Sequence, residues 1–331
     1  VRSGILNSVH TFANDPERGL FILIFLFVLI FLSLFIFFFF HKNGEKTLHS
    51  FSWLSKETSI LVNNWFMMYF LSVVLIGTVY PIFLDVMISK KISVGPPFYN
   101  KLIIPFLVPF LLMMAIGPRL KWTISKLQDK KYLISLLVIS IILAYLILKN
   151  FNQSILINTV LVSSAFYLFF ISLRDFFVKN RNISQNIAHF GFSLLILSIL
   201  FNNLFSSETI TNLKVGETFE NSDTKIVFES VNQKQEKNYK SIIANFTIYN
   251  SNGDKDKLSP ELRIYNQPII VTSEADIKTT IMKDKFIVFN LVQNQEFFNV
   301  RYQVKPFMLW IWLSVILISI GGFLSILKRR L

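Results

Sequence analysis

The sequence predicts a polytopic α-helical membrane protein, with about seven transmembrane helices and one small β-rich domain outside the membrane. Hydrophobic residues make up 53% of the chain and include 36 phenylalanines, more apolar surface than a single soluble core would bury. Several apolar stretches are long enough to cross a bilayer, which takes about 20 helical residues. Residues 206–304 are instead polar and alternate in the way typical of strands.

Charge and cysteine content exclude several classes of function. The net charge of +13 would suggest nucleic acid in a soluble protein, but cytoplasmic loops of membrane proteins also collect Lys and Arg. We therefore expect no nucleic-acid partner. The absence of cysteine excludes disulfides, thiolate metal sites and Cys-x-x-Cys redox chemistry in this chain. The chain begins with Val and its first residues are unlike a signal peptide, so we expect a fragment or a processed piece.

The first predicted helix begins at Asp15-Pro16-Glu17, which combine an N-cap residue, a proline at the first helical position and an acid in the first turn. The apolar run that follows, residues 20–40, is the first expected span. The same criterion of apolar length predicts the other six spans at about 58–86, 101–116, 132–148, 155–173, 184–205 and 305–327.

Three domains follow from this pattern. Residues 1–205 form an extracytoplasmic lead-in and six transmembrane helices, and residues 305–331 form the last helix and a basic tail. Between them, residues 206–304 form the β-rich domain, with strands expected at 225–231 and 242–249. The connection Lys91-Ile-Ser-Val-Gly95-Pro96-Pro97-Phe-Tyr-Asn100 is expected to be a rigid loop, because it holds two prolines and a glycine.

Orientation follows from the Lys and Arg residues of the short loops. One set of alternate loops holds 14 of them and the other set holds 6. Because cytoplasmic loops carry the excess, the basic tail is expected in the cytoplasm and the β domain outside. The residues before the first span and the Gly95-Pro96-Pro97 connection then lie on the outer face with the β domain.

Two of the four histidines are candidate sites. His189 is the only ionisable residue in its span, about 7–8 Å from the predicted cytoplasmic end, and such residues are functional candidates by default. Helical spacing puts Gln185, Asn186 and Ser193 on its face, so a polar stripe that only joins helices is an equal alternative. His10 could be an iron ligand or an interfacial residue. His41 and His49 are expected to be solvated loop residues.

Four stretches carry a resemblance to a known family. They are Arg2-Ser-Gly-Ile-Leu-Asn-Ser-Val-His10, the Lys91–Asn100 connection, Gln185-Asn-Ile-Ala-His189-Phe-Gly and Lys305-Pro-Phe-Met-Leu-Trp-Ile-Trp312. In this order they resemble segments of the CcmF and NrfE proteins, the haem lyase subunits of the multi-component cytochrome c maturation system. The resemblance covers nearly the whole chain. It does not include the family's tryptophan-rich haem-handling segment, which lies upstream of what this chain contains.

The resemblance implies a function in cytochrome c biogenesis, as the haem-binding subunit of a cytochrome c haem lyase. His10 falls on the family's extracytoplasmic haem ligand, in the catalytic role, and His189 on an axial ligand of a transmembrane b-type haem. Gln185, Gly95, Pro96 and Pro97 would support these sites. Haem is then both a resident redox cofactor (haem b) and the transferred substrate, attached to the Cys-x-x-Cys-His motif of apocytochrome c.

The implied partners are a haem chaperone, apocytochrome c, a thiol-handling subunit, membrane lipid and the family's upstream half, which supplies the second ligand of each haem. The implied location is the bacterial inner membrane, with the β domain in the periplasm, or the mitochondrial inner membrane. A permease or assembly scaffold without enzymatic activity is the alternative, and it would bind no haem.

Overall fold

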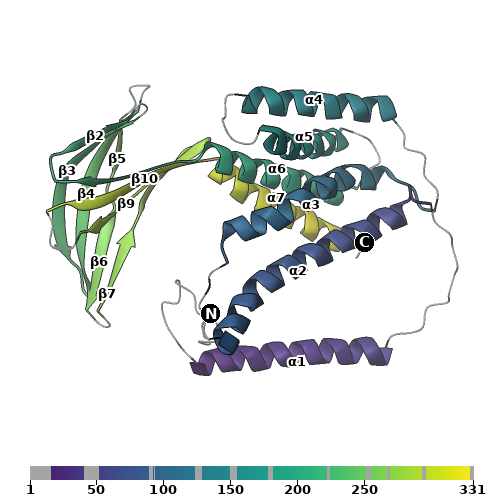
Figure 1. The fold of residues 1–331 in the computed structure, drawn as a ribbon, viewed down its shortest axis with the longest axis horizontal. Coiled ribbons are helices and arrows are strands. Elements are labelled where there is room, and N and C mark those ends of the chain that lie inside the picture. The colour runs from purple at the N-terminus through teal and green to yellow at the C-terminus, as the bar shows by residue number, and fades with distance from the viewer. Residues whose placement is uncertain are drawn as a thin grey trace. The chain divides into compact units, whose positions relative to one another are not determined.

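A computed structural model describes eleven segments of the chain, residues 16–40, 52–88, 92, 94–123, 129–149, 155–177, 182–221, 224–250, 255–266, 269–292 and 296–328. These segments form two compact units, Val1–Leu168 and Phe169–Leu331. The first unit holds helices α1 to α4 and most of α5. The second unit holds the end of α5, then α6, the β domain and α7 (Figure 1).

The helices confirm the predicted fold class. Six helices in the described part of the chain are long and apolar enough to cross a membrane, and α1 contributes a shorter apolar stretch, Ile24–Phe40. The predicted count of about seven spans is therefore approximate. The helices are α1 (Pro16–Phe40), α2 (Lys56–Ile88), α3 (Pro96–Ile116), α4 (Lys130–Leu148), α5 (Ile155–Asp175), α6 (Ile183–Phe205) and α7 (Met308–Lys328).

The start of α3 corrects one expectation. Pro96 and Pro97 were predicted to lie in a rigid loop before a helix at 101, but they occupy the first turn of α3. A proline fits there because the first helical N–H groups have no partner within the helix, and the fixed φ of proline suits the helix. Gly95 is the N-cap residue, with φ −108° and ψ −175°, and its carbonyl accepts from Phe98 N at 3.2 Å.

Within the first unit, α2 packs against α3 through aromatic side chains. The Tyr69 hydroxyl donates to the Leu102 carbonyl at 2.9 Å, and the Tyr69 and Phe106 ring centroids lie 4.2 Å apart. Gly77 provides room for the Tyr99 ring, because a Cβ at Gly77 would lie 2.6 Å from the Tyr99 hydroxyl oxygen. The sequence Phe98-Tyr99 therefore connects the start of α3 to α2.

The β domain is a sandwich of two antiparallel sheets. One sheet has the strand order β1-β10-β9-β8, and the other has the order β2-β3-β4-β6-β7 with β5 paired to β4. The strands include both segments predicted from alternation. They are β1 (Ser207–Leu213), β2 (Thr218–Asn221), β3 (Thr224–Gln235), β4 (Tyr239–Asn250), β5 (Lys255–Leu258), β6 (Glu261–Asn266), β7 (Ile269–Glu274), β8 (Asp276–Thr279), β9 (Lys283–Leu291) and β10 (Phe298–Pro306).

Buried side chains from both sheets form one core. Phe228 and Phe246 stack at 4.5 Å between centroids, and Phe289 and Tyr302 come from the facing sheet. At the edge of this core, buried Asp256 of β5 pairs with Lys285 of β9 and with Lys278 of β8. These ion pairs join the two sheets. Burial, with the nearby charge of Asp256, raises the pKa of Tyr302 to about 12.

Helices α6 and α7 approach each other closely. A Cβ at Gly321 would lie 2.7 Å from Ala188 N and 2.8 Å from Ser184 O, and a Cβ at Gly191 would lie 3.0 Å from Ile318 N. Small residues allow this approach, which is how helices commonly associate in membranes.

The β domain continues directly from these two helices. Strand β1 follows α6 and pairs with β10, which precedes α7 (Figure 1). The Asn202 side-chain amide donates to the Pro306 carbonyl at 2.6 Å, and the Phe201 and Phe307 rings lie 5.4 Å apart. The edge strand β1 and its neighbour β10 are thus joined directly to the helix pair, β1 to α6 and β10 to α7.

We predict that Gly321→Ala destabilises the protein by about 1–3 kcal/mol, because the added methyl group overpacks the contact with α6. Gly322→Ala is the matched control, since a Cβ there meets no heavy atom within 4 Å. It should be neutral or slightly stabilising, as alanine is the better helix former. Thermal unfolding in detergent measures both variants. Equal effects of the two substitutions would contradict the close packing at Gly321.

Candidate functional site

The candidate site centres on His189 of α6, the only histidine in the described part of the chain. Its side chain is partly buried. It lies six residues after Ile183, the first residue of α6, which corresponds to about 9 Å along the axis. The imidazole is therefore placed within a candidate membrane span rather than at its end. Gln185, also partly buried, lies one turn earlier on the same face of the helix.

The neighbours of His189 on one side face the end of α5. The buried Asn186 side-chain amide donates to the Asp175 carbonyl at 2.7 Å. The Phe190 ring lies 5.4 Å from that of Phe169 and 5.3 Å from that of Phe176. Asn186 thus joins two helices, which is the packing interpretation of the polar stripe.

The neighbours on the other side face α7. Ala188 lies against Gly321, and Gly191 lies against Ile318. Ser193 donates to the Phe190 carbonyl of its own helix at 2.8 Å and is fully buried. Because residues 188 and 190 are fixed by two different helices, the backbone that carries His189 is held from both sides. Gln185, Asn186 and Ser193 lie three or four positions from His189 and so share its side of the helix, and of these Asn186 is bonded to the end of α5.

The chemistry of this face fits one axial ligand of a haem. A neutral imidazole is a standard iron ligand, and a transmembrane helix can present it to a planar group in the apolar interior. One histidine supplies one ligand. Within the described residues no group of three or more His, Cys, Asp or Glu side chains is placed to hold a metal ion. Because His189 is the only histidine in the described part of the chain, a second histidine ligand would come from outside these residues.

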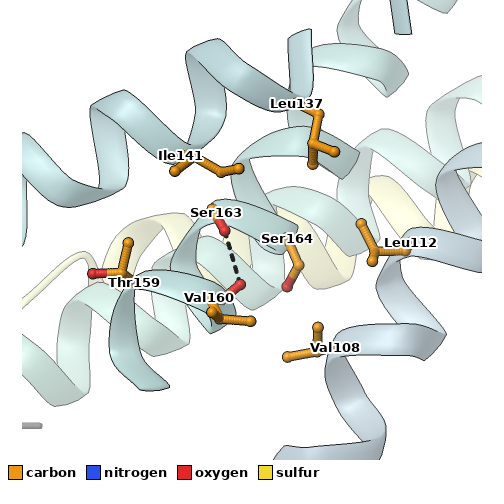
Figure 2. Close-up of a pocket in the computed structure, with 8 residues that line it drawn as sticks. All are labelled: Val108, Leu112, Leu137, Ile141, Thr159, Val160, Ser163 and Ser164. Atoms are coloured by element: carbon orange, nitrogen blue, oxygen red, sulfur yellow. Dashed lines mark hydrogen bonds between the residues drawn. The ribbon is translucent and has the colours of Figure 1, made fainter. Parts of the chain in front are cut away.

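A cavity in the first unit offers a different environment. It has a volume of about 200 Å³ and lies between α3, α4 and α5. Figure 2 shows its lining of aliphatic side chains with three hydroxyls, from Val108, Leu112, Leu137, Ile141, Thr159, Val160, Ser163 and Ser164. The Ser163 hydroxyl donates to the Val160 carbonyl at 2.9 Å. Cavities that enclose a cofactor are larger, about 300–1,000 Å³, and these lining residues include no iron ligand.

The other predicted site residues lie either at the start of α3 or outside the described residues. Pro96 and Pro97 are exposed at the start of α3, and Gly95 precedes them. A Cβ at Gly95 would meet only Pro97 Cδ, at 3.6 Å, so a larger residue fits there. His10, His41 and His49 lie outside the described residues.

A polar cluster on β6 has a structural explanation. Arg263 Nε donates to Glu261 Oε2 at 3.0 Å, and its guanidinium lies 5.2 Å from the centre of the Tyr239 ring. The hydrogen bond from Arg263 to Glu261 raises the pKa of the arginine. The Ser241 hydroxyl also donates to Glu261, at 3.2 Å. These side chains satisfy one another across β4 and β6.

The sequence analysis did not predict the contact between α7 and the part of α6 that carries His189. Gly321, which determines how closely α7 approaches Ala188, was not singled out. The available signal was the Gly321-Gly322 pair, which interrupts an otherwise apolar final span. A glycine inside a membrane helix commonly marks a helix contact, but only the structure distinguishes Gly321 from Gly322.

Comparison with known proteins gives a consistent picture. A family described as the CcmF C-terminal beta-sandwich matches residues 204–306. The cytochrome c-type biogenesis protein CcmF of Pseudomonas fluorescens is 31% identical over the whole chain, which corresponds to 52% of the relative. For the CcmF of Escherichia coli the identity is 28%, over 52% of the relative, and for the NrfE of Haemophilus influenzae it is 27%, over 53%.

A solved structure, cytochrome c haem lyase CcmF, has a similar fold. It superposes with a TM-score of 0.65 and 20% sequence identity, covering 82% of this chain and 46% of the other. The chain spans about half the length of the curated relatives it matches. The matching β-sandwich and the relatives that align along the whole chain show that the chain corresponds to the C-terminal half of the CcmF and NrfE proteins, and the solved structure shares its fold.

Proposed function

We propose that this chain is part of a cytochrome c haem lyase, in which it binds one haem within the membrane and helps to hold a second at the outer face. The observation that carries the proposal is His189, a partly buried imidazole inside a candidate span, on a helix packed on both sides. Relatives of the whole chain are named cytochrome c-type biogenesis proteins, which supports the same role.

His189 would donate a ring-nitrogen lone pair to the iron of the membrane-bound haem. Gln185, one turn away on the same face, would orient the imidazole through a hydrogen bond, as residues around metal ligands commonly do. Asn186 and Ala188 would hold the helix against its neighbours without touching the haem. The bound haem b would supply one-electron redox chemistry, which keeps the iron of the transferred haem reduced.

At the outer face, His10 would ligate the haem that is the substrate. In the proposed reaction each cysteine S–H of apocytochrome c adds across a vinyl C=C bond of this haem. One S–C bond and one C–H bond form, and no group leaves. His10 would fix the position of the haem during this addition. Gly95, Pro96 and Pro97 would define the start of α3 at the same face.

The location and partners follow from this role. The loop charges favour the β domain outside and the basic tail in the cytoplasm. Of the three domains, 1–205, 206–304 and 305–331, the second is the sandwich, and it would then lie in the periplasm beside a bacterial inner membrane. The partners would be a haem chaperone, apocytochrome c, a thiol-handling subunit and the segment that corresponds to the other half of the relatives. That segment would supply the second ligand of each haem.

The orientation is tested by labelling single cysteines in spheroplasts with a membrane-impermeant maleimide. The 331-residue chain has no cysteine, so Val215→Cys and Trp122→Cys each introduce one thiol at an exposed position, 49% and 59% exposed respectively. We predict that the thiol at 215, between β1 and β2, reacts in intact spheroplasts. The thiol at 122, between α3 and α4, should react only after lysis. The reverse pattern would refute the orientation.

The membrane haem is tested by His189→Ala in the complete gene product. We expect loss of most of the b-type haem, because an axial ligand is removed. The reduced-minus-oxidised absorbance spectrum, normalised to the amount of folded protein, measures the content of b-type haem. Gln185→Ala should lose less haem. Asn186→Ala is the structural control, since it removes the bond to the Asp175 carbonyl and should lower stability without lowering haem per folded protein.

Two outcomes would contradict the assignment of His189. Full haem content in His189→Ala would make this residue a packing residue only. A complete lack of a Soret band in the purified parent protein would favour a scaffold or permease that binds no haem.

The role of His10 is tested by His10→Ala in the complete gene product. We predict that holocytochrome c is severely reduced, because misplacement of reacting groups by about 1 Å can cost on the order of a hundredfold in rate. The b-type spectrum should stay close to normal. Haem staining of cytochrome c on denaturing gels, beside spectra of the variant, measures both effects. His10→Cys should restore part of the activity, since thiolate also ligates haem iron. Normal cytochrome c maturation in His10→Ala would leave this residue without a catalytic role.

A further inference from the structure

The turn between β8 and β9 presents two apolar side chains to the outside. Ile281 is 67% exposed and Met282 is 60% exposed. The turn is closed by hydrogen bonds from Thr280 N to Lys283 O, at 3.0 Å, and from Lys283 N to the Thr280 hydroxyl, at 3.1 Å. Tight hairpin loops usually carry Gly, Asn or Asp. An Ile-Met pair at this position leaves apolar surface that does not contribute to the core of the sandwich.

The same turn is bonded to the beginning of α7. The Trp310 indole N–H donates to the Ile281 carbonyl at 2.9 Å, and Phe307 N donates to the Met282 carbonyl at 2.8 Å. Trp310 is the third residue of α7. The turn therefore lies beside the first turn of this helix, about 3 Å along its axis from Met308. The candidate span of α7 also begins at Met308. The depth of the turn is thus determined by the depth of this helix end.

The connection to α7 is held in a specific conformation. Phe307 has a φ of 60°, a left-handed value that is uncommon for an aromatic residue and carries strain. Its N–H is fixed by Met282 and its ring contacts Phe201 at 5.4 Å between centroids. The preceding carbonyl, Pro306, accepts from Asn202. The turn is therefore one of the contacts that hold the strained corner between β10 and α7.

The chemistry around the tip matches a membrane surface. Tryptophan is enriched at the level of the lipid headgroups, and lysine can extend its ammonium to the phosphates while its stem stays in apolar surroundings. Trp310 lies beside the turn, and Lys283, at its end, is exposed. Ile281 and Met282 provide the apolar part of such an interface.

We propose that the β8–β9 turn inserts Ile281 and Met282 into the lipid at the surface of the membrane. With α6 and α7 it gives the β domain a third attachment to the bilayer, besides its two covalent connections. The turn lies beside β10 in the same sheet, since Lys283 of β9 pairs with Pro306 of β10, so this contact adds to the two covalent connections at the same end of the sheet. The contact requires lipid alone and does not depend on haem or on a protein partner.

The test uses the absence of cysteine from the 331-residue chain. Met282→Cys carries a nitroxide label, and the protein is reconstituted in vesicles of phosphatidylethanolamine and phosphatidylglycerol. Power-saturation electron paramagnetic resonance then compares the accessibility of the label to oxygen, which concentrates in lipid, with its accessibility to a water-soluble nickel chelate. The matched control is Leu291→Cys, which is 50% exposed at the opposite end of β9, about 27 Å from Lys283.

We expect the ratio of oxygen to nickel accessibility to be several-fold higher at 282 than at 291. An equal ratio at both positions would place the turn in water and overturn the proposal. Low accessibility to both reagents at 282 would show that protein covers the turn, and would equally overturn it. Because both positions are exposed, the labels should leave the fold intact, which circular dichroism checks. No haem enters this measurement, so its result is distinct from that of the proposed function.

Discussion

The close contact between α6 and α7 is the constraint on which the second unit of the structure depends. At Gly321 the two backbones approach to a distance at which a methyl group does not fit, and at Gly191 a methyl group would make a tight contact with Ile318. In lipid there is little hydrophobic driving force between helices, so close packing of this kind determines which helices associate. The contact includes Ala188, and it therefore fixes the helix at the residue next to His189.

The β domain extends this arrangement beyond the two candidate membrane helices. Its strands β1 and β10 leave from α6 and α7 and pair with each other, so the helix pair continues as a strand pair. The side chain of Asn202 and the ring of Phe307 stabilise the junction, and the pairs of Asp256 with Lys278 and Lys285 join the two sheets. A rotation of α7 against α6 would therefore be transmitted to the sandwich as well as to the backbone that carries His189.

The polar residues around His189 illustrate how one stripe can serve two purposes. Asn186 is used by the fold, because its amide satisfies a carbonyl at the end of α5. Gln185 and His189 are partly buried and lie one turn apart on the same helix. Structural comparison at 20% identity establishes the shared fold. The proposed haem chemistry depends instead on His189 and Gln185 and on the similarity of the whole chain to biogenesis proteins.

The sequence alone determined the helices, two of the strands and the family resemblance, because these depend on local patterns. Hydropathy located the spans to within a few residues, except at α3, where Pro96 and Pro97 begin the helix instead of preceding it. Alternation located β3 and β4, and motifs indicated the CcmF/NrfE family. Tertiary structure decided which residues meet across the chain. Asn202 bonds to Pro306, Gly321 rather than Gly322 contacts α6, and Trp310 holds the turn at Ile281. Such contacts depend on the three-dimensional arrangement of distant segments, which local composition and periodicity do not specify.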